Sequence, residues 1–349
     1  MKKSLGLFLL ITAIVSCKKI QDKPTGTFLT GDGVFIIDEG NFRSGNGSLS
    51  FYSYDSSKVY NDLFSSINGR PLGDVPNSMG ILDNKAYIIV NNSGKIEVIN
   101  KSTLKSIATV NGLISPRNIS FVNYSKAYIT SMYSDSIIIL SLKDYSISGY
   151  INIRRSSESI AITGGKAYVA NWVGGKEVMV INTETDEVID SIEVGVEPES
   201  MVTDKNQLLW VLCNGGWMRE NFAELIGINT SIDEIEKRFV FPAKLASPSC
   251  LQIDGSRETL YYLENGVQRM GIAASGLPTV PFIPQSGSYF YKIGINPANG
   301  DVFVTDAVDY QQNGLVIYYN KDGTLVSTHS TDIIPGIMYF KVAFHLQEE

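Results

Sequence analysis

Cysteine, histidine and basic charge are all scarce in this chain. Its 349 residues include 3 Cys and 2 His, and 36 acidic side chains outnumber 29 basic ones, which gives a net charge of −7. The Cys and His residues do not have metal-ligand spacing, which argues against a zinc-type centre. A nucleic-acid binder usually carries a basic excess gathered on one face, and the sequence has no such run. We therefore expect neither a metal nor a nucleic-acid partner.

Long hydrophobic runs are also rare, and the one at residues 5–15 is too short to span a bilayer. It follows the basic start Met1-Lys2-Lys3, so residues 1–16 are predicted to be a signal peptide. The run ends in Val15-Ser16-Cys17, the aliphatic-small-Cys pattern of a bacterial lipobox, which predicts lipidation of Cys17. Lipidation would hold the protein at a membrane. The alternative is an ordinary signal peptide followed by an incidental Cys.

The segment after the lipobox is polar, and the rest of the chain is not. Residues 17–28 carry Lys, Gln, Asp, Pro, Thr and Gly, and are predicted to be the lipidated Cys and a flexible tether. Residues 29–349 are then one large domain. Its two remaining cysteines, Cys213 and Cys250, lie in apolar segments. They are expected to be buried free thiols, with a single disulfide as the alternative.

A repeat runs along this domain. The segments Lys85-Ala86-Tyr87-Ile88, Lys126-Ala127-Tyr128-Ile129 and Lys166-Ala167-Tyr168-Val169 are spaced by 41 and then 40 residues. Weaker copies are Gly33–Ile36, Leu208–Val211, Thr259–Tyr262 and Asp301–Val304, which makes seven. Such periods are typical of propellers and other repeat architectures.

Within each copy the pattern indicates short strands. β-Branched and aromatic runs alternate with Gly, Asn, Asp and Ser turns, and only residues 231–237 are compatible with a helical turn or two. Residues 335–344 match the opening strand of other copies, and the first copy lacks one. The sequence therefore predicts an all-β, seven-bladed β-propeller closed by a C-terminal strand that completes the first blade.

In a propeller, one face is formed by the loops that enter each innermost strand and those that join the second and third strands. Here these loops are rich in aromatic, amide and basic residues, and aromatic side chains at loop tips need a partner. The recurring Pro-x-Ser and Pro-x-Asn segments before the inner strands also fit turns in which the small polar side chain caps the backbone. The candidate ligand-binding residues are Asn41, Phe42, Arg43, Asn77, Asn91, Arg117, Asn118, Met132, Tyr133, Glu158, Asn171, Trp172, Glu199, Asn214, Trp217, Arg219, Asn265, Phe290, Asp306, Tyr310 and Tyr339.

No catalytic residues are predicted. The sequence has no nucleophile elbow and no Gly-rich phosphate loop before a helix. Asp38 and Glu39 are adjacent on a predicted strand, so they point to opposite faces. Glu158 and Glu199, at equivalent positions of neighbouring blades, are the plausible acid/base pair, with hydrogen-bonding caps on the channel rim as the alternative. We therefore expect a binding protein, not an enzyme.

The segment Phe35–Leu49 resembles the Glu-Gly-Asn-Phe…Gly-Ser-Leu start of BtuG-like surface lipoprotein propellers of Bacteroides type. The Lys-Ala-Tyr repeats are similar to the wider group of YVTN-type, surface-layer propellers. The resemblance implies a lipoprotein of the outer membrane, displayed at the cell surface. It implies that the protein binds a corrinoid such as cobalamin and passes it to a BtuB-like TonB-dependent transporter, without a bound cofactor of its own. The alternatives are a glycan- or protein-binding propeller and an enzyme such as a lyase or lactonase.

Overall fold

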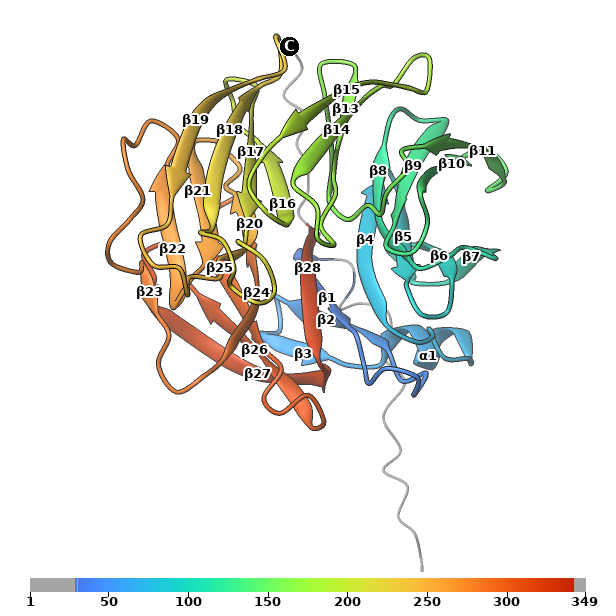
Figure 1. Ribbon diagram of the computed structural model, residues 1–349. Coiled ribbons are helices and arrows are strands. Elements are labelled where there is room, and N and C mark those ends of the chain that lie inside the picture. Colours follow the sequence, from blue (N-terminus) through green and yellow to red (C-terminus); the bar gives the residue numbers. More distant parts are fainter. Residues whose placement is uncertain (1–28, 30, 342–349) are drawn as a thin grey trace, which may run out of the picture.

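The computed structural model describes residue 29 and residues 31–341, and these form seven four-stranded antiparallel sheets arranged in a ring (Figure 1). The predicted signal peptide, Cys17 and the tether lie outside the described residues. The prediction of an all-β, seven-bladed propeller is confirmed. The strands of the blades, from the inner to the outer one, are as follows.

The first blade contains β28 (Pro335–Lys341), β1 (Gly33–Asp38), β2 (Ser48–Ser53) and β3 (Lys58–Tyr60). The second to fourth blades contain β4 (Pro76–Leu82), β5 (Lys85–Val90), β6 (Lys95–Asn100) and β7 (Ser106–Asn111); β8 (Pro116–Phe121), β9 (Lys126–Ser131), β10 (Ser136–Ser141) and β11 (Ile147–Asn152); and β12 (Ile160–Thr163), β13 (Lys166–Ala170), β14 (Glu177–Asn182) and β15 (Glu187–Glu193). The fifth to seventh contain β16 (Pro198–Thr203), β17 (Leu208–Cys213), β18 (Glu224–Asn229) and β19 (Glu234–Val240); β20 (Ser249–Ile253), β21 (Thr259–Leu263), β22 (Gly266–Gly271) and β23 (Ile283–Pro284); and β24 (Phe290–Ile295), β25 (Val302–Asp306), β26 (Asn313–Tyr319) and β27 (Leu325–Ile333).

The ring closes in the first blade, as predicted. β28 pairs antiparallel with β1, so that Met338 lies opposite Ile36 and Lys341 opposite Gly33. The first blade therefore combines strands from the two ends of the domain, and Figure 1 shows red β28 beside blue β1. Backbone hydrogen bonds hold the ring closed.

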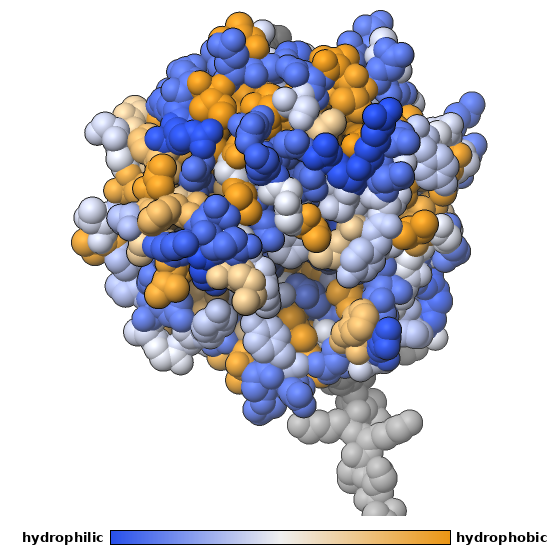
Figure 2. Space-filling model, viewed as in Figure 1, coloured by the Kyte–Doolittle hydropathy of each residue, from blue (hydrophilic) through white to orange (hydrophobic). Residues whose placement is uncertain are grey.

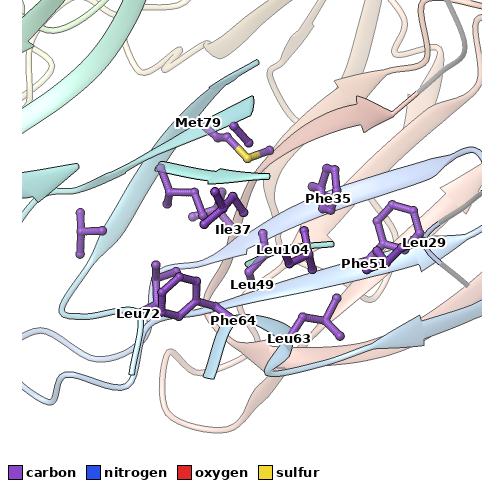
Figure 3. Packing of buried hydrophobic residues seen from close by; sticks show 14 residues of the cluster. Leu29, Phe35, Ile37, Leu49, Phe51, Leu63, Phe64, Leu72, Met79 and Leu104 are labelled. Carbon is purple, nitrogen blue, oxygen red and sulfur yellow. The ribbon is translucent and has the colours of Figure 1, made fainter. Parts of the chain in front are cut away.

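The apolar core is divided among the junctions between blades. Seven clusters of buried side chains each draw their members from two neighbouring blades. The cluster between the first and second blades includes Phe35, Phe51, Phe64 and Leu104 (Figure 3). A blade thus buries its faces only against its neighbours, which is why closure of the ring stabilises every blade.

The Lys-Ala-Tyr repeat joins consecutive blades on the face opposite the loops that join second and third strands. Lys166 Nζ donates to Asp233 Oδ2 at 2.6 Å, and the Tyr168 hydroxyl donates to Asp233 Oδ1 at 2.6 Å. Lys126 and Tyr128 contact Asp186 of the next blade in the same way. Both Asp residues have a positive φ, 59° and 61°, which Asp tolerates better than most residues. These contacts explain why Lys and Tyr recur together.

We expect Asp233→Asn to lower the free energy of unfolding by about 1.5 kcal/mol, because Asn keeps the backbone conformation and removes the charge that pairs with Lys166. Urea denaturation monitored by circular dichroism measures the difference. Asp190→Asn, at an exposed position of β15, is the matched control and is expected to change little. Equal stability of the two variants would contradict a structural role for this contact.

Two local features differ from the sequence-based expectation. Residues 231–237 form a turn and the start of β19, with no helix. The short helix α1 (Leu63–Asn68) lies between β3 and β4, where it buries Leu63 and Phe64. Asn68 Nδ2 donates to the carbonyls of Phe64 and Leu104. Six residues are too few for a helical period to be visible in the sequence.

Cys213 and Cys250 are both buried free thiols, as expected. Within residues 31–341, no helix has the length and apolar composition that a membrane span needs.

Candidate functional site

The inner strands all begin on the same face of the ring. This face, here called the loop face, carries the connections between consecutive blades and the loops that join second and third strands. A cavity of about 440 Å³ occupies the central channel, and it is lined by residues near the start of most inner strands. Cavities of this size are typical of small-molecule sites. The channel is therefore the candidate site.

β-Bulges bring one polar residue of several inner strands into the channel. The pairing registers of β4, β8, β16, β20 and β24 all shift just after the strand begins. A bulge leaves an extra residue unpaired and re-aims its side chain. The residues at these shifts, with Glu158 before β12 and Glu39 after β1, are here called the channel belt. The channel belt consists of Asn77, Arg117, Glu158, Glu199, Cys250, Tyr291 and Glu39, all of which line the cavity.

The first blade supplies its member of the belt from a different strand. Gly336 occupies the second position of β28, where the equivalent residues of β4 and β16 are Asn77 and Glu199. A Cβ atom at Gly336 would lie 2.8 Å from Glu39 Oε1. The glycine thus leaves the space that the Glu39 side chain needs to enter the channel.

The Pro-x-Ser segments connect blades. Ser78 Oγ donates to the Arg117 carbonyl at 2.6 Å, and Leu251 N–H donates to Ser200 Oγ at 2.9 Å. The small polar residue therefore bonds to the following blade, not to its own turn as the sequence suggested. The prolines follow residues in the left-handed region, including Val75 and Ile334. Since β-branched residues rarely adopt this conformation, the backbone is strained at the channel mouth.

Arg117 and Glu158 form a bidentate ion pair in the channel. Arg117 Nε donates to Glu158 Oε2 and one terminal nitrogen donates to Oε1, both at 2.7 Å. Both side chains are mostly buried, with 17% and 13% exposure. Burial tends to lower the pKa of Arg117, but the negative charge of Glu158 outweighs it, so that the pKa is raised. Glu158, a candidate acid or base, is therefore held as a paired carboxylate.

A second group of titratable side chains lies across the channel. Burial raises the pKa of the Cys250 thiol and that of Glu39. Interaction with Cys250, then with Tyr291, Glu199 and Glu39, raises the pKa of Lys292 against the effect of burial. The Tyr291 hydroxyl lies 3.1 Å from both oxygens of Glu39. Lys292 thus remains positively charged among acidic groups.

Hydrogen bonds and ion pairs connect the blades around the channel at six of the seven junctions. In blade order, they join Tyr339 to Met79, Asn77 to Arg117, Arg117 to Glu158, Glu199 to Cys250, Cys250 to Tyr291 and Tyr291 to Glu39. Among the described residues, no such bond joins Glu158 or Ser159 of the fourth blade to Glu199 or Ser200 of the fifth. This gap is here called the open junction.

Exposed apolar side chains surround the channel mouth on the loop face. Phe42 is 64% exposed, Tyr133 76% and Trp217 81%, and they come from the first, third and fifth blades. The other exposed apolar residues of these loops are Ile114, Val173, Met218, Phe222, Leu245, Tyr289, Val308 and Tyr310. Figure 2 shows hydrophobic and hydrophilic residues interspersed on the surface in view. Together with the polar channel, these side chains offer apolar contact around a hydrogen-bonding centre.

The structure divides the sequence-predicted site residues into four groups. Six of them line the channel cavity: Asn77, Arg117, Asn118, Glu158, Trp172 and Glu199. Arg219, Asn265 and Phe290 line a separate cavity of about 260 Å³ near the sixth blade. The loop residues Asn41, Phe42, Arg43, Met132, Tyr133, Asn214, Trp217 and Tyr310 lie on the loop face.

The remaining four make hydrogen bonds within the protein. Asn91 Nδ2 donates to Ser115 Oγ, and Asn171 Oδ1 accepts from Ser156 Oγ. Asp306 accepts the N–H of Tyr289, and the Tyr339 hydroxyl accepts the N–H of Met79. These four side chains hold loops and blades in place.

Sequence reasoning missed Glu39, Cys250, Tyr291 and Lys292 as channel residues. The signal for three of them is positional. Cys250 and Tyr291 are the second residues of their inner strands, as Arg117 and Glu199 are, and Lys292 is the third residue, as Asn118 is. Glu39 has no such signal, because it enters from β1. Within residues 31–341, no group of three or more His, Cys, Asp or Glu is arranged to hold a metal ion.

Comparison with family models identifies the chain. Residues 32–341 match the model of a domain of unknown function, DUF5074. The chain belongs to the DUF5074 family. The match covers all seven blades, including closing strand β28. No match to this DUF5074 protein is found among curated protein sequences.

Solved structures share the propeller fold with this DUF5074 protein. A quinonprotein alcohol dehydrogenase-like protein from Bacteroides thetaiotaomicron superposes with a TM-score of 0.71 at 15% identity, over 89% of this chain and 78% of that one. A candidate 6-phosphogluconolactonase from Bacteroides uniformis gives 0.68 at 11% identity, over 88% and 99%. Virginiamycin B lyase from Staphylococcus aureus gives 0.57 at 13% identity, over 73% and 83%. At these identities the likeness shows the fold alone.

Proposed function

We propose that this protein is a cell-surface lipoprotein that captures a corrinoid, such as cobalamin, over the channel mouth and passes it to a BtuB-like TonB-dependent transporter. The observation that carries the proposal is the arrangement of exposed apolar side chains around a polar, mixed-charge channel on the loop face. The resemblance of Phe35–Leu49 to BtuG-like propellers supports the choice of ligand.

The chemistry of the site supports a ligand that is both flat and polar. A corrinoid has broad apolar ring faces and a fringe of carboxamide arms. Phe42, Tyr133 and Trp217 offer apolar and aromatic surface, and Asn77 and Asn118 offer amide groups. A corrinoid is larger than the 440 Å³ cavity, so the ring would lie across the mouth and its arms would enter the channel.

The arrangement of titratable groups favours binding over catalysis. Glu158 is bound to Arg117 through both carboxylate oxygens, and Glu199 Oε2 accepts from Ser200 Oγ and Cys250 N–H. Groups fixed in this way hold a ligand well and give little freedom for proton transfer. A rigid ring of blades also loses little entropy on capture. We propose that no metal, nucleic acid or bound cofactor takes part.

Isothermal titration calorimetry with cyanocobalamin tests the proposal. We expect binding at or below micromolar concentration, and we expect Trp217→Ala to weaken it about tenfold or more without a change in melting temperature, because this exposed side chain has no packing role. Tyr124→Ala is the matched control, because Tyr124 is exposed on the opposite face. Trp210 cannot serve as a control, because it is fully buried.

Absence of cyanocobalamin binding at micromolar concentration would refute the proposal. Binding of an oligosaccharide at the same face, lost in Trp217→Ala, would instead support a glycan-binding propeller. The lipid anchor is tested separately, by mass spectrometry of the mature protein and of a Cys17→Ala variant.

A further inference from the structure

Within residues 31–341, the open junction between the fourth and fifth blades lacks the hydrogen bonds or ion pairs that connect neighbouring blades at the other six junctions around the channel. Glu158 and Ser159 lie on one side, and Glu199 and Ser200 on the other, and all four line the cavity. Glu158 already uses both oxygens for Arg117. The other polar groups at this junction are therefore available to form hydrogen bonds with a ligand.

Trp172, in the loop between β13 and β14 of the fourth blade, carries an unused donor. Its indole Nε1 is buried and has no hydrogen-bond partner, and its side chain lines the same cavity. A buried N–H without an acceptor is costly, and such groups in native structures need an explanation. The backbone of this loop is closed by a turn in which Gly175 N–H donates to the Trp172 carbonyl at 3.3 Å. A Cβ atom at Gly175 would lie 2.0 Å from the Asn171 carbonyl oxygen, so only glycine fits this turn.

Glu199 supplies an unused acceptor. Its Oε2 accepts from Cys250 N–H at 3.0 Å and from Ser200 Oγ at 2.6 Å, which fixes the orientation of the carboxylate. Within the described part of the chain, no hydrogen bond reaches its Oε1, and this oxygen is not among the buried atoms without partners. Glu199 Oε1 is therefore an accessible oxygen of a side chain that lines the cavity, and it can accept an N–H or O–H from a ligand.

We propose that the open junction is a subsite for a primary carboxamide arm of the ligand, whose C=O accepts from Trp172 Nε1 and whose NH₂ donates to Glu199 Oε1. This inference rests on the proposed corrinoid function and assigns the point at which one peripheral arm enters the channel. A primary carboxamide carries two donors and an acceptor on one planar group, which matches one donor and one acceptor of the protein.

Charge selects against the other arms that a ligand could offer. A carboxylate would bring a negative charge beside Glu199, Glu158 and Glu39, and it would have no proton for Glu199 Oε1. An ammonium group would lie near Arg117 and Lys292 and could not accept from Trp172. The subsite therefore favours a neutral group with both donor and acceptor.

Calorimetric titration with cyanocobalamin and its separate monocarboxylic acid derivatives, each with one peripheral carboxamide hydrolysed, tests the subsite. We expect one derivative to bind wild-type protein about 100-fold more weakly than cyanocobalamin and the others to bind within a few fold. Trp172→Phe, which keeps an aromatic ring and removes the N–H, is expected to weaken cyanocobalamin binding about tenfold. Tyr124→Phe is the matched control, because it also removes one hydrogen-bond donor from an aromatic side chain, and Tyr124 is exposed on the face opposite the loop face. It is expected to leave cyanocobalamin binding unchanged.

Glu199→Gln adds a readout that a merely structural role would not give. The Gln oxygen would keep the bond from Cys250 N–H, so its NH₂ would face the cavity. We expect this variant to bind cyanocobalamin more weakly and to bind the discriminated carboxylate derivative about tenfold better than wild type does. Equal melting temperatures of the variants would show that the folds are intact.

The outcomes separate the two proposals. If wild-type protein fails to bind cyanocobalamin, the corrinoid function is refuted and the subsite with it. If cyanocobalamin binds but all derivatives bind alike, or Trp172→Phe and Glu199→Gln behave as wild type, the subsite is refuted and the function stands. Competition by glucose that is lost in Trp172→Phe would assign the junction to hydroxyl groups and overturn the carboxamide proposal.

Discussion

Deletion of residues 335–349 is expected to abolish cooperative folding of the monomer. The deletion removes β28, which is the inner strand of the first blade and the only partner on that side of β1 among the described residues. Met338 is buried between the seventh and first blades, and Tyr339 packs against the cluster between the first and second. Loss of these side chains and of the strand pairing is expected to cost about 5–10 kcal/mol, which is comparable with the stability of a whole domain.

Size-exclusion chromatography and urea denaturation measure this effect. A truncation that ends after Lys341 keeps the whole of β28 and is the matched control. A synthetic peptide of residues 333–341 is added to the protein that lacks residues 335–349. It is expected to restore a folded species, since an extended peptide can pair with the exposed edge of β1. If the protein without β28 had the same midpoint urea concentration of unfolding as the control, closure of the ring would not depend on this strand.

Replacement of Arg117 by Met is expected to lower the free energy of unfolding by about 3 kcal/mol. The substitution leaves Glu158 mostly buried without its two charge-assisted hydrogen bonds. Removal of one partner of a buried pair is strongly destabilising, because the remaining charge is uncompensated. The variant is measured by urea denaturation at neutral pH.

A double-mutant cycle provides the control for Arg117→Met. Since Gln at position 158 carries no charge, Arg117→Met combined with Glu158→Gln is expected to recover a large part of the lost stability. Strictly additive losses in the double variant would mean that the ion pair makes no energetic contribution and that Arg117 acts through packing alone.

The blades could be predicted from the sequence because each one repeats the same local pattern. Lys85, Lys126 and Lys166 recur with Ala and Tyr at a blade-length interval, and turn residues separate the strands. The structure adds the physical reason, since Lys126 and Lys166 bind an Asp in the next blade. At the corresponding turn that faces Lys85, Tyr145 replaces Asp, and Lys85 Nζ lies 5.3 Å from its ring centroid.

The channel could be predicted only in part. Arg117, Glu158 and Glu199 are predictable because they lie where inner strands begin, and Trp172 because it lies in a loop between a second and a third strand. Bulges depend on the pairing between strands, so the positions of Cys250 and Tyr291 near the start of their strands did not by themselves show that these residues enter the channel. In the first blade, Glu39 fills the space that Gly336 leaves in the channel. These two residues are almost 300 positions apart in the sequence, so their contact becomes visible only when the ring is closed.

The position of β28 also sets the order in which the molecule can be completed. A ribosome makes β1 first and β28 last, so the first blade lacks its inner strand until nearly the whole chain has been synthesised. Until then the nascent chain can build blades two to seven, but it cannot lock the ring. Completion of the molecule is therefore coupled to completion of synthesis, and a prematurely terminated chain exposes an unpaired β1 edge that quality-control proteases can recognise.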